Sequence, residues 1–284
     1  MWRFLESVDR RWVFLLVAVA VIVPTLLPFK VPMPISNSTQ LAYDAIEDLR
    51  EGDLVVVSLG YGPSSQAELQ PQAKALLRHC FRRGLRVFLM SLWPDAPPLG
   101  DEALQEVVES DEFLDSTTGQ SRLRAGVDYV DVGYRPGLDA VILRMATDMA
   151  GFFETDARGE PLGSLPIMEG VRGFDQVALV VDLAAGDSAD YWIIYGNGRY
   201  GVDVAVGVTG VIVSQMYPFL DSGQLRGLIG GGVGAAEYEA LVNAPGSGMK
   251  RVSTLSIVHT LVIALVVLGN VIYLRQRRAE GEAT

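Results

Sequence analysis

The sequence is poor in the side chains on which most enzyme and metal chemistry depends. Its 284 residues include one cysteine, Cys80, and two histidines, His79 and His259. One thiol excludes a disulfide within the chain and any zinc or iron–sulfur site built on cysteines. Lys74 is the only lysine between the two long apolar runs, apart from the lysines that flank those runs. These scarcities leave little material for a nucleophile–base pair.

Positive charge is also scarce. The chain has a net charge of −11, and residues 31–251 hold 16 basic and 30 acidic side chains, which gives this region a charge near −14. A region this acidic is repelled by nucleic acid and by anionic lipid surfaces. Nucleic-acid binding is therefore disfavoured.

The few groups that could act as nucleophile or base have poor settings. His79 and Cys80 follow Arg78 at the end of a predicted helix, where a histidine favours the helix C-terminus and a cysteine favours packing. Lys74 lies on a helix face that we expect to be exposed. Acidic residues at 182, 187 and 190 match no calcium-loop spacing. We expect no catalytic residue, no metal and no cofactor.

Two long uncharged runs, residues 12–29 and 252–274, lie near the ends of the chain. Each is long enough to cross a hydrocarbon layer of about 30 Å as a helix. Ala18-Val19-Ala20 resembles a signal-peptide cleavage site, but the apolar run continues beyond it, which favours an uncleaved anchor. His259 lies inside the second run, where it fits a helix interface or the headgroup region better than a functional group.

The basic residues that flank these runs predict an orientation. Six arginines lie on the terminal sides, against three basic residues on the inner sides. The positive-inside rule then places both termini in the cytoplasm and the central region outside the plasma membrane. The predicted organisation is a cytoplasmic segment 1–11, a span 12–29, an exocytoplasmic domain 30–251, a span 252–274 and a cytoplasmic tail 275–284.

The central region alternates between short apolar runs and amphipathic segments. The apolar runs predict five buried strands, at residues 53–59, 86–92, 127–133, 176–183 and 202–208. Helices are predicted at residues 41–50, 67–83, 101–114, 139–153 and 190–195. This alternation is typical of an α/β fold: a doubly wound, mostly parallel, five-stranded Rossmann-like sheet flanked by two transmembrane helices.

A ligand site in such a sheet lies beyond the carboxyl ends of the strands. The segments that follow the predicted strands combine glycine with hydroxyl, carboxylate and aromatic side chains, which suit a small molecule. Turns between strands and helices use the same residue types for local reasons, so the pattern also fits plain turns. The candidate ligand-binding residues are Tyr61, Ser64, Ser65, Trp93, Asp182, Asp187 and Thr209.

The segment 226–236 is unusually rich in glycine. Gly230, Gly232 and Ala235 match the spacing of a dinucleotide fingerprint, but that motif belongs after the first strand of a fold and this one follows the last predicted strand. An acidic helix start after it also disfavours a pyrophosphate. We expect these glycines to allow close packing of helices or subunits above the membrane. The candidate oligomer-interface residues are Gly230, Gly231, Gly232 and Gly234.

Several short motifs resemble a known family when taken in order. They are the segments 61–63, 180–187, 205–209, 217–225 and 234–239. Together they are similar to an uncharacterised family of prokaryotic membrane-anchored α/β proteins. The resemblance implies the architecture and brings no reaction and no catalytic residue.

These observations favour a non-catalytic subunit of a membrane complex that serves assembly or ligand sensing. Its expected partners are the lipid bilayer, other copies of the chain or other membrane proteins, and a small-molecule ligand. One alternative is a membrane-bound hydrolase or transferase that uses the strand-end loops. Another is the solute-binding subunit of a transporter. Two spans alone form no substrate pathway, so this role would require partner proteins.

Overall fold

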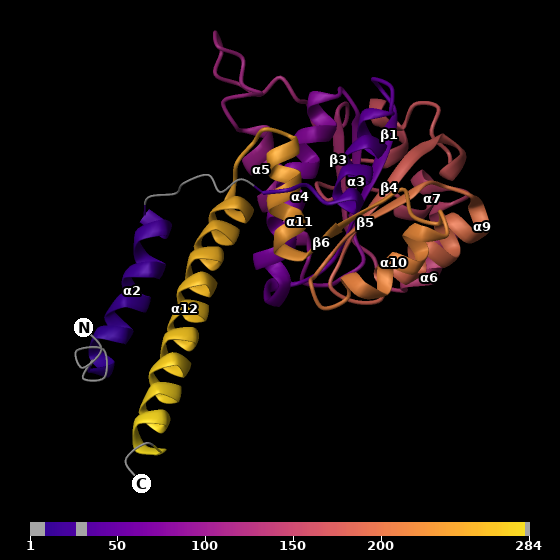
Figure 1. Cartoon of the computed structure of the whole chain (residues 1–284). Helices are drawn as coiled ribbons and strands as arrows, with labels where there is room; N and C mark the ends of the chain where they lie inside the picture. Colours follow the sequence, from indigo (N-terminus) through magenta and orange to yellow (C-terminus); the bar gives the residue numbers. More distant parts are fainter. Residues whose placement is uncertain (1–8, 27–32, 282–284) are drawn as a thin grey trace. The chain divides into compact units, whose positions relative to one another are not determined.

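The computed structural model describes residues 9–26 and 33–281. The chain divides into two units: an α/β domain, Met33–Gly248, and a second unit made of the two chain ends (Figure 1). Each unit is described by itself below.

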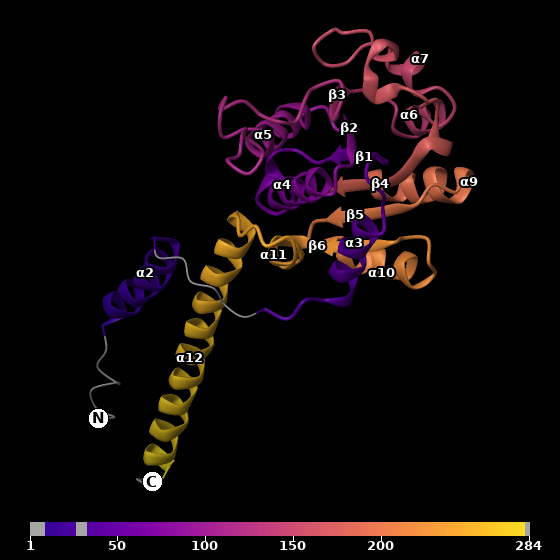
Figure 2. The ribbon, with the colours of Figure 1, turned by 90° about the horizontal axis from the view of Figure 1, so that it is seen from above.

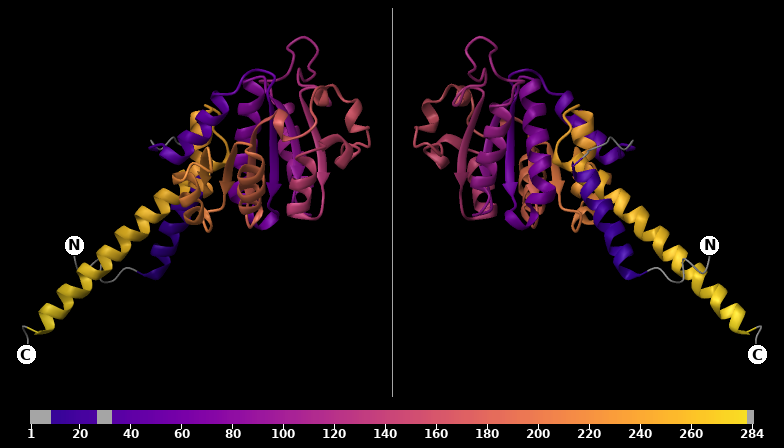
Figure 3. Two further views of the ribbon diagram at one scale, coloured as in Figure 1. Left: turned by 90° about the vertical axis from the view of Figure 1, so that its right-hand side faces the viewer. Right: turned by 90° about the vertical axis from the view of Figure 1, so that its left-hand side faces the viewer.

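The domain is built on six parallel strands in the order β3-β2-β1-β4-β5-β6. The strands are β1 (Leu54–Gly60), β2 (Arg86–Ser91), β3 (Tyr129–Tyr134), β4 (Val177–Ala184), β5 (Val204–Val208) and β6 (Gly227–Gly230). This is the doubly wound order, in which successive strands are added outward from β1 and then outward from β4. The α/β class is confirmed, and the five-stranded sheet is corrected to six strands that are all parallel. Figure 3 shows the strands side by side.

Helices cover both faces of the sheet (Figure 2). One face carries α3 (Asn37–Glu47), α4 (Gln66–Arg82), α5 (Pro97–Val108) and α11 (Gly231–Leu241). The other carries α6 (Leu138–Met145), α7 (Met149–Phe153), α8 (Ser188–Tyr191) and α10 (Val213–Asp221). After α8 the chain continues through a π-helical segment, Trp192–Asn197, into the short α9, Gly198–Tyr200. Short 3-10 turns lie at Pro63–Ser65, Leu162–Ser164, Pro166–Met168 and Phe174–Gln176.

The core consists of two apolar layers, one on each side of the sheet. In β1, Val55 and Val57 pack toward α4, while Val56 packs toward the opposite layer. Both sides of the strand are buried, so the sequence shows an unbroken apolar run rather than an alternating pattern. This is why the central strands were predictable from hydropathy alone.

Strand β6 was not predicted. It has only four residues, and glycine stands at both ends of Leu228 and Ile229. A run this short does not separate a strand from a loop by composition. Parallel pairing with β5, in which Val206 lies opposite Leu228, makes it a strand.

Helix positions agree with the expected segments, with shifts at their ends. Ser36 caps α3 through a hydrogen bond from the backbone N–H of Thr39. Helix α5 begins at Pro97, four residues before the expected start, because proline is well suited to the first helical turn. The segment expected as one helix at 139–153 divides into α6 and α7, separated by Asp148, which caps α7.

The chain ends hold two apolar helices. Within the described residues one helix segment, Ser247–Arg275, is long and apolar enough to cross a membrane, with a mean hydropathy of 2.4; it forms most of α12 (Ser247–Gly281). Helix α2 (Arg10–Leu26) is apolar but has 17 residues and contains Pro24. Among the residues described, one of the two predicted spans therefore qualifies by length and composition, not both. Positions 27–29 of the first predicted span, and residues 1–8 and 282–284, lie outside that part of the chain.

Candidate functional site

The topological switch point of the sheet lies between β1 and β4. These strands are neighbours, yet the chain leaves β1 toward α4 on one face and leaves β4 toward α8 on the other. The two connections diverge, so in this fold a ligand crevice is expected outside the carboxyl ends of these strands. Here the two connections are held close together: a Cβ placed on Gly60 would overlap the Ser188 side chain.

A buried polar cluster ties the switch point together. Asp182 lies directly opposite Ser58 on the neighbouring strand and is fully buried. Its Oδ2 accepts a hydrogen bond of 2.7 Å from Ser188 Oγ at the start of α8. Trp192 Nε1 in turn donates to Ser58 Oγ at 3.0 Å. The cluster thus joins β1, β4 and the helical segment that follows β4.

Burial also alters the acidity of Asp182. Loss of solvation raises the pKa of this carboxyl group to about 7, and hydrogen bonds from Ser58 and Ser188 oppose the rise. Oδ1 is buried without a hydrogen-bond partner among the described residues. Asp182 has no exposed surface in this structure, and its bond to Ser188 joins β4 to the start of α8.

The seven predicted ligand residues separate into two groups. Three are buried: Tyr61, Asp182 and Thr209. The other four are exposed or half-buried at the carboxyl edge of the sheet: Ser64, Ser65, Trp93 and Asp187. Tyr61, expected as a wall of a pocket, instead donates to Gln70 Oε1 at 2.6 Å inside the core. Trp93 lies against Gly62, so the loops after β1 and β2 do meet.

The first turns of α4 reach the carboxyl ends of β5 and β6. The backbone N–H of Gly210 donates to Glu68 Oε2 at 2.9 Å, and Gln72 Nε2 donates to the carbonyl oxygen of Gly231 at 3.0 Å. A carboxylate therefore already lies beside the N-terminus of α11, where a dinucleotide fingerprint would place a phosphate.

The predicted interface glycines take part in close packing within the domain. Gly231 is buried and has a φ of +58°, a conformation that favours glycine. A Cβ at Gly234 would lie 3.0 Å from the backbone carbon of Ile229. In this segment the exposed apolar side chain is Val233, at 53% exposure. These glycines thus pack closely against other residues of the same domain. Their role between subunits stays a prediction.

Helix α11 also holds the two segments through which the chain enters and leaves the domain. Ser36, at the start of α3, donates to Glu237 Oε2 at 2.5 Å. The backbone N–H groups of Gly246 and Gly248, at the start of α12, donate to the two carboxylate oxygens of Glu239 at 3.0 Å each. Both glutamates are buried. One helix thus fixes the beginning and the end of the domain beside each other.

A second tie joins α11 to α4 and α3. His79 Nδ1 lies 2.8 Å from Tyr238 Oη, and His79 Nε2 lies 2.8 Å from Glu47 Oε1. Burial lowers the pKa of His79, although Glu47 opposes this, and the hydrogen bond from His79 lowers the pKa of Glu47. A neutral imidazole then accepts from Tyr238 and donates to Glu47. Tyr43 stacks on the same ring, with centroids 4.4 Å apart.

The other groups with nucleophilic chemistry also have structural surroundings. Cys80 is buried, and burial raises the pKa of its thiol to about 12, so it remains protonated. Lys74 Nζ lies 3.0 Å from Glu102 Oε1 and 2.5 Å from Glu106 Oε2. None of these contacts resembles a nucleophile poised beside a base.

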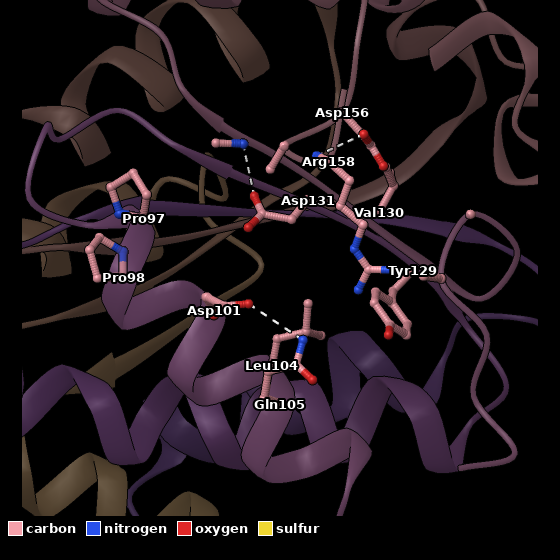
Figure 4. Close-up of a pocket in the computed structure, with 14 residues that line it drawn as sticks. Pro97, Pro98, Asp101, Leu104, Gln105, Tyr129, Val130, Asp131, Asp156 and Arg158 are labelled. Carbon is pink, nitrogen blue, oxygen red and sulfur yellow. Dashed lines mark hydrogen bonds between the residues drawn. The ribbon is translucent and has the colours of Figure 1, made fainter. Parts of the chain in front are cut away.

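A cavity of about 370 Å³ lies at the opposite edge of the sheet, beside β3. Helix α5 forms one wall, β3 forms the floor, and a turn that includes residues 156–158 forms the other wall (Figure 4). Asp101, Asp131 and Asp156 bring carboxylates to it, and Arg158 brings a guanidinium group. Within the parts of the chain described here, no group of His, Cys, Asp or Glu is arranged to hold a metal ion.

Sequence reasoning missed the residues that matter most in these arrangements. Glu68 and Gln72 were read only as part of an amphipathic helix, and Asp131 only as part of a strand. A detectable signal existed for Asp131, because a carboxylate inside an apolar strand is unusual. For Glu237 and Glu239 no local signal existed, since acidic residues are ordinary on a helix surface.

Comparisons with known proteins add little. No protein-family model matches the chain, and no curated protein matches it. A solved structure described as “Structure of MT0777” has 11% sequence identity and a TM-score of 0.32, covering 63% of this chain and 85% of that one. The fold is therefore assigned from the pairing of its strands.

Proposed function

We propose that the chain is a membrane-anchored, non-catalytic subunit of a membrane complex that serves assembly or ligand sensing. The observation that carries this proposal is the position of α11. Its first turn packs against the loops at the carboxyl ends of β5 and β6, and its later residues hold both ends of the domain through Glu237 and Glu239.

This arrangement links the strand-end loops to the segment at which the domain ends, through a single helix. Helix α11 has 11 residues, which corresponds to about 16 Å of helix. A partner or ligand that shifts the Gly210 loop would act on α11 directly, because Gly231 lies against that loop. The same helix then holds the start of α12, whose apolar segment is the candidate span.

The membrane part of the proposal extends the orientation expected from charge. In it, both apolar helices lie in the plasma membrane, both termini face the cytoplasm, and the domain faces outward. The acidic character of the domain supports this placement, since a negative surface is repelled by anionic headgroups and stays in solvent. The structural roles of His79, Cys80 and Lys74 support a non-catalytic role.

The surface proposed for assembly is the rim formed by Val211 and Val233. Val211 lies in the loop after β5, and Val233 lies in the first turn of α11, which contacts that loop where Gly231 meets Gly210. Their exposed fractions are 83% and 53%. The occupant we propose is a second copy of the chain, because both anchors confine copies to one plane with the same orientation.

The test is the native mass of the full chain extracted in mild detergent, measured together with its subunit composition. We expect a mass at least double the 30.7 kDa of one chain. Val211→Arg and Val233→Arg should reduce the mass to that of one chain. Ile194→Arg, at a side chain with 55% exposure on the opposite face of the sheet, is the matched control and should leave the mass unchanged.

A wild-type chain that is monomeric and carries no partner would overturn the assembly proposal. An oligomer that survives both rim substitutions would place the interface elsewhere. A complex that contains other membrane proteins and a single copy of this chain would replace the second copy as the occupant.

A further inference from the structure

The cavity beside β3 has the size of a small-molecule site and is partly open to solvent. Its volume of about 370 Å³ lies within the range of ligand pockets. The side chains of Pro97, Pro98 and Leu104 on α5 give it apolar walls (Figure 4). Polar side chains converge on it from three separate elements: Asp101 and Gln105 from α5, Asp131 from β3, and Asp156 and Arg158 from the turn. Apolar walls with convergent polar groups suit a small, polar organic molecule.

The walls of the cavity are already held in place. The turn at its outer side is fixed by a hydrogen bond from the backbone N–H of Ala157 to the carbonyl oxygen of Asp131, at 2.8 Å. Asp156 Oδ1 accepts from the backbone N–H groups of Arg158 and Glu160, at 2.9 Å each. Ligand binding would therefore require little ordering of the chain, which favours affinity.

Asp131 occupies the centre of the cavity. Figure 4 shows its carboxylate directed into the space between α5 and the turn. Oδ1 accepts one hydrogen bond, from the backbone N–H of Gly133 at 2.8 Å. Burial raises the pKa of this carboxyl group to about 6, and the negative charges of Asp101 and Asp156 add to the rise, while the hydrogen bond from Gly133 and the positive charge of Arg158 oppose it. A carboxylate in this setting gains most from a cation placed beside it.

The spacing of the acidic side chains decides which kind of cation fits. A divalent metal ion requires several oxygen ligands at about 2.0–2.6 Å, and the cavity carboxylates do not form such a group. An ammonium group on a short carbon chain makes weaker demands: one charge-assisted hydrogen bond, nearby negative charge and apolar walls.

We propose that this cavity binds a small organic molecule through a primary ammonium group, which donates to Asp131 between Asp101 and Asp156. The carbon chain of the ligand packs against the two prolines and Leu104. The guanidinium group of Arg158, on an exposed residue at the same cavity, is placed to meet a carboxylate at the other end of a zwitterionic ligand. A simple amine and an amino acid thus share the ammonium contact and differ at Arg158. The site is separate from α11, so it does not depend on the assembly proposal.

The test uses the full chain in detergent micelles with three probes that share a four-carbon chain: butylamine, 4-aminobutanoate and 1,4-butanediol. Binding is measured by saturation-transfer NMR and by calorimetry at pH 7.5 in about 150 mM salt, which screens loose association with the acidic surface. We expect one or both of the ammonium probes to bind and the diol not to bind. Asp131→Asn should weaken ammonium binding by roughly tenfold to a hundredfold, as expected for a lost charge-assisted hydrogen bond.

Matched variants separate the site from general charge effects. Asp175→Asn removes one charge at an exposed position outside the cavity and should leave binding unchanged. Asp101→Asn, on the surface of α5, should weaken ammonium binding severalfold, and it provides the test if Asp131→Asn fails to fold. Arg158→Gln should weaken 4-aminobutanoate and spare butylamine, which identifies the zwitterion as the ligand class. Equal effects of Arg158→Gln on both probes identify a simple amine.

Two results would overturn the proposal. One is binding of the ammonium probes that is unaffected by both Asp131→Asn and Asp101→Asn. The other is the absence of any signal from the ammonium probes at about 10 mM, a concentration at which even millimolar affinity is detected.

Discussion

At the scale of single residues, two carboxyl groups on the strands of the sheet have raised pKa values and different surroundings. Asp182 lies at the switch point but is enclosed by Ser58, Ser188 and the Trp192 indole. Asp131 lies at the sheet edge and faces a cavity. Both carboxyl groups have a raised pKa, but only Asp131 has access to solvent, through the cavity that it lines.

The raised pKa of Asp182 predicts how stability depends on pH. Between about pH 4 and pH 7 the folded protein keeps a proton that the unfolded chain releases, so this residue makes stability fall as pH rises. A shift from 3.8 to about 7 corresponds to roughly 4 kcal/mol at its full extent. Asp182→Asn removes the effect, so the variant should gain stability relative to wild type as pH rises.

The measurement is thermal unfolding of the full chain in detergent micelles from pH 4.5 to pH 8, followed by circular dichroism. Asp131, whose pKa is also raised, is present in both proteins, so the difference between them isolates Asp182. If the melting temperatures of the two proteins change with pH in parallel, Asp182 is ionised in the folded protein. That result would contradict this account.

At the scale of elements, α11 connects parts of the domain that are far apart in sequence. It contacts the Gly210 loop at its start, His79 of α4 through Tyr238, and the start of α12 through Glu239. The carboxylate of Glu239 satisfies two of the backbone N–H groups near the beginning of α12. Helix starts leave such groups unpaired unless a side chain accepts from them.

Glu239→Gln should therefore loosen the start of α12 while keeping the volume of the side chain. The amide of glutamine carries no charge, so each hydrogen bond that the carboxylate accepted is weakened by at most about 1.5–3 kcal/mol. Amide hydrogen exchange at Gly246 and Gly248 should accelerate by roughly tenfold to a hundredfold in the full chain in lipid nanodiscs. Glu237→Gln, which acts on Ser36 instead, is the control and should leave these amides unchanged. Unchanged exchange in Glu239→Gln would show that α12 begins independently of α11.

At the scale of the whole molecule, the orientation of the domain can be read with a single engineered thiol. Cys80 is buried and its pKa is raised, so wild type should give no labelling with a charged maleimide. Ser64 is exposed at the carboxyl edge of the sheet. Ser64→Cys in intact cells should be labelled from outside, as the positive-inside rule predicts. Labelling that requires lysis would place the domain in the cytoplasm and reverse the proposed topology.

How far the sequence predicts this molecule depends on the range of the forces involved. The five long apolar runs became β1 to β5, because burial on both faces leaves a local mark in composition. The acidic charge of the central region and the apolar runs near the chain ends can also be read directly from the sequence. The four-residue β6 left no such mark, since only its pairing with β5 distinguishes it from a glycine-rich loop.

Among the candidate site residues, sequence reasoning located loops but not accessibility. Tyr61 and Trp93 looked equivalent as aromatic residues after strands, yet Tyr61 is buried in the core and Trp93 is 48% exposed. Gly231 was expected to lie between subunits, and its positive φ and contact with Gly210 show what it does inside the domain. Such outcomes depend on which elements pack nearby, and local patterns carry no record of that.

The sequence by itself determined the α/β class, the acidic domain, the apolar ends and the shortage of nucleophilic groups, because each follows from composition or from short-range periodicity. Tertiary structure alone decided the strand order, the enclosure of Asp182, the use of α11 as a clamp for both ends of the domain, and the cavity around Asp131. Each of these depends on contacts between residues far apart in the chain, where packing and desolvation act on neighbours that only the fold brings together.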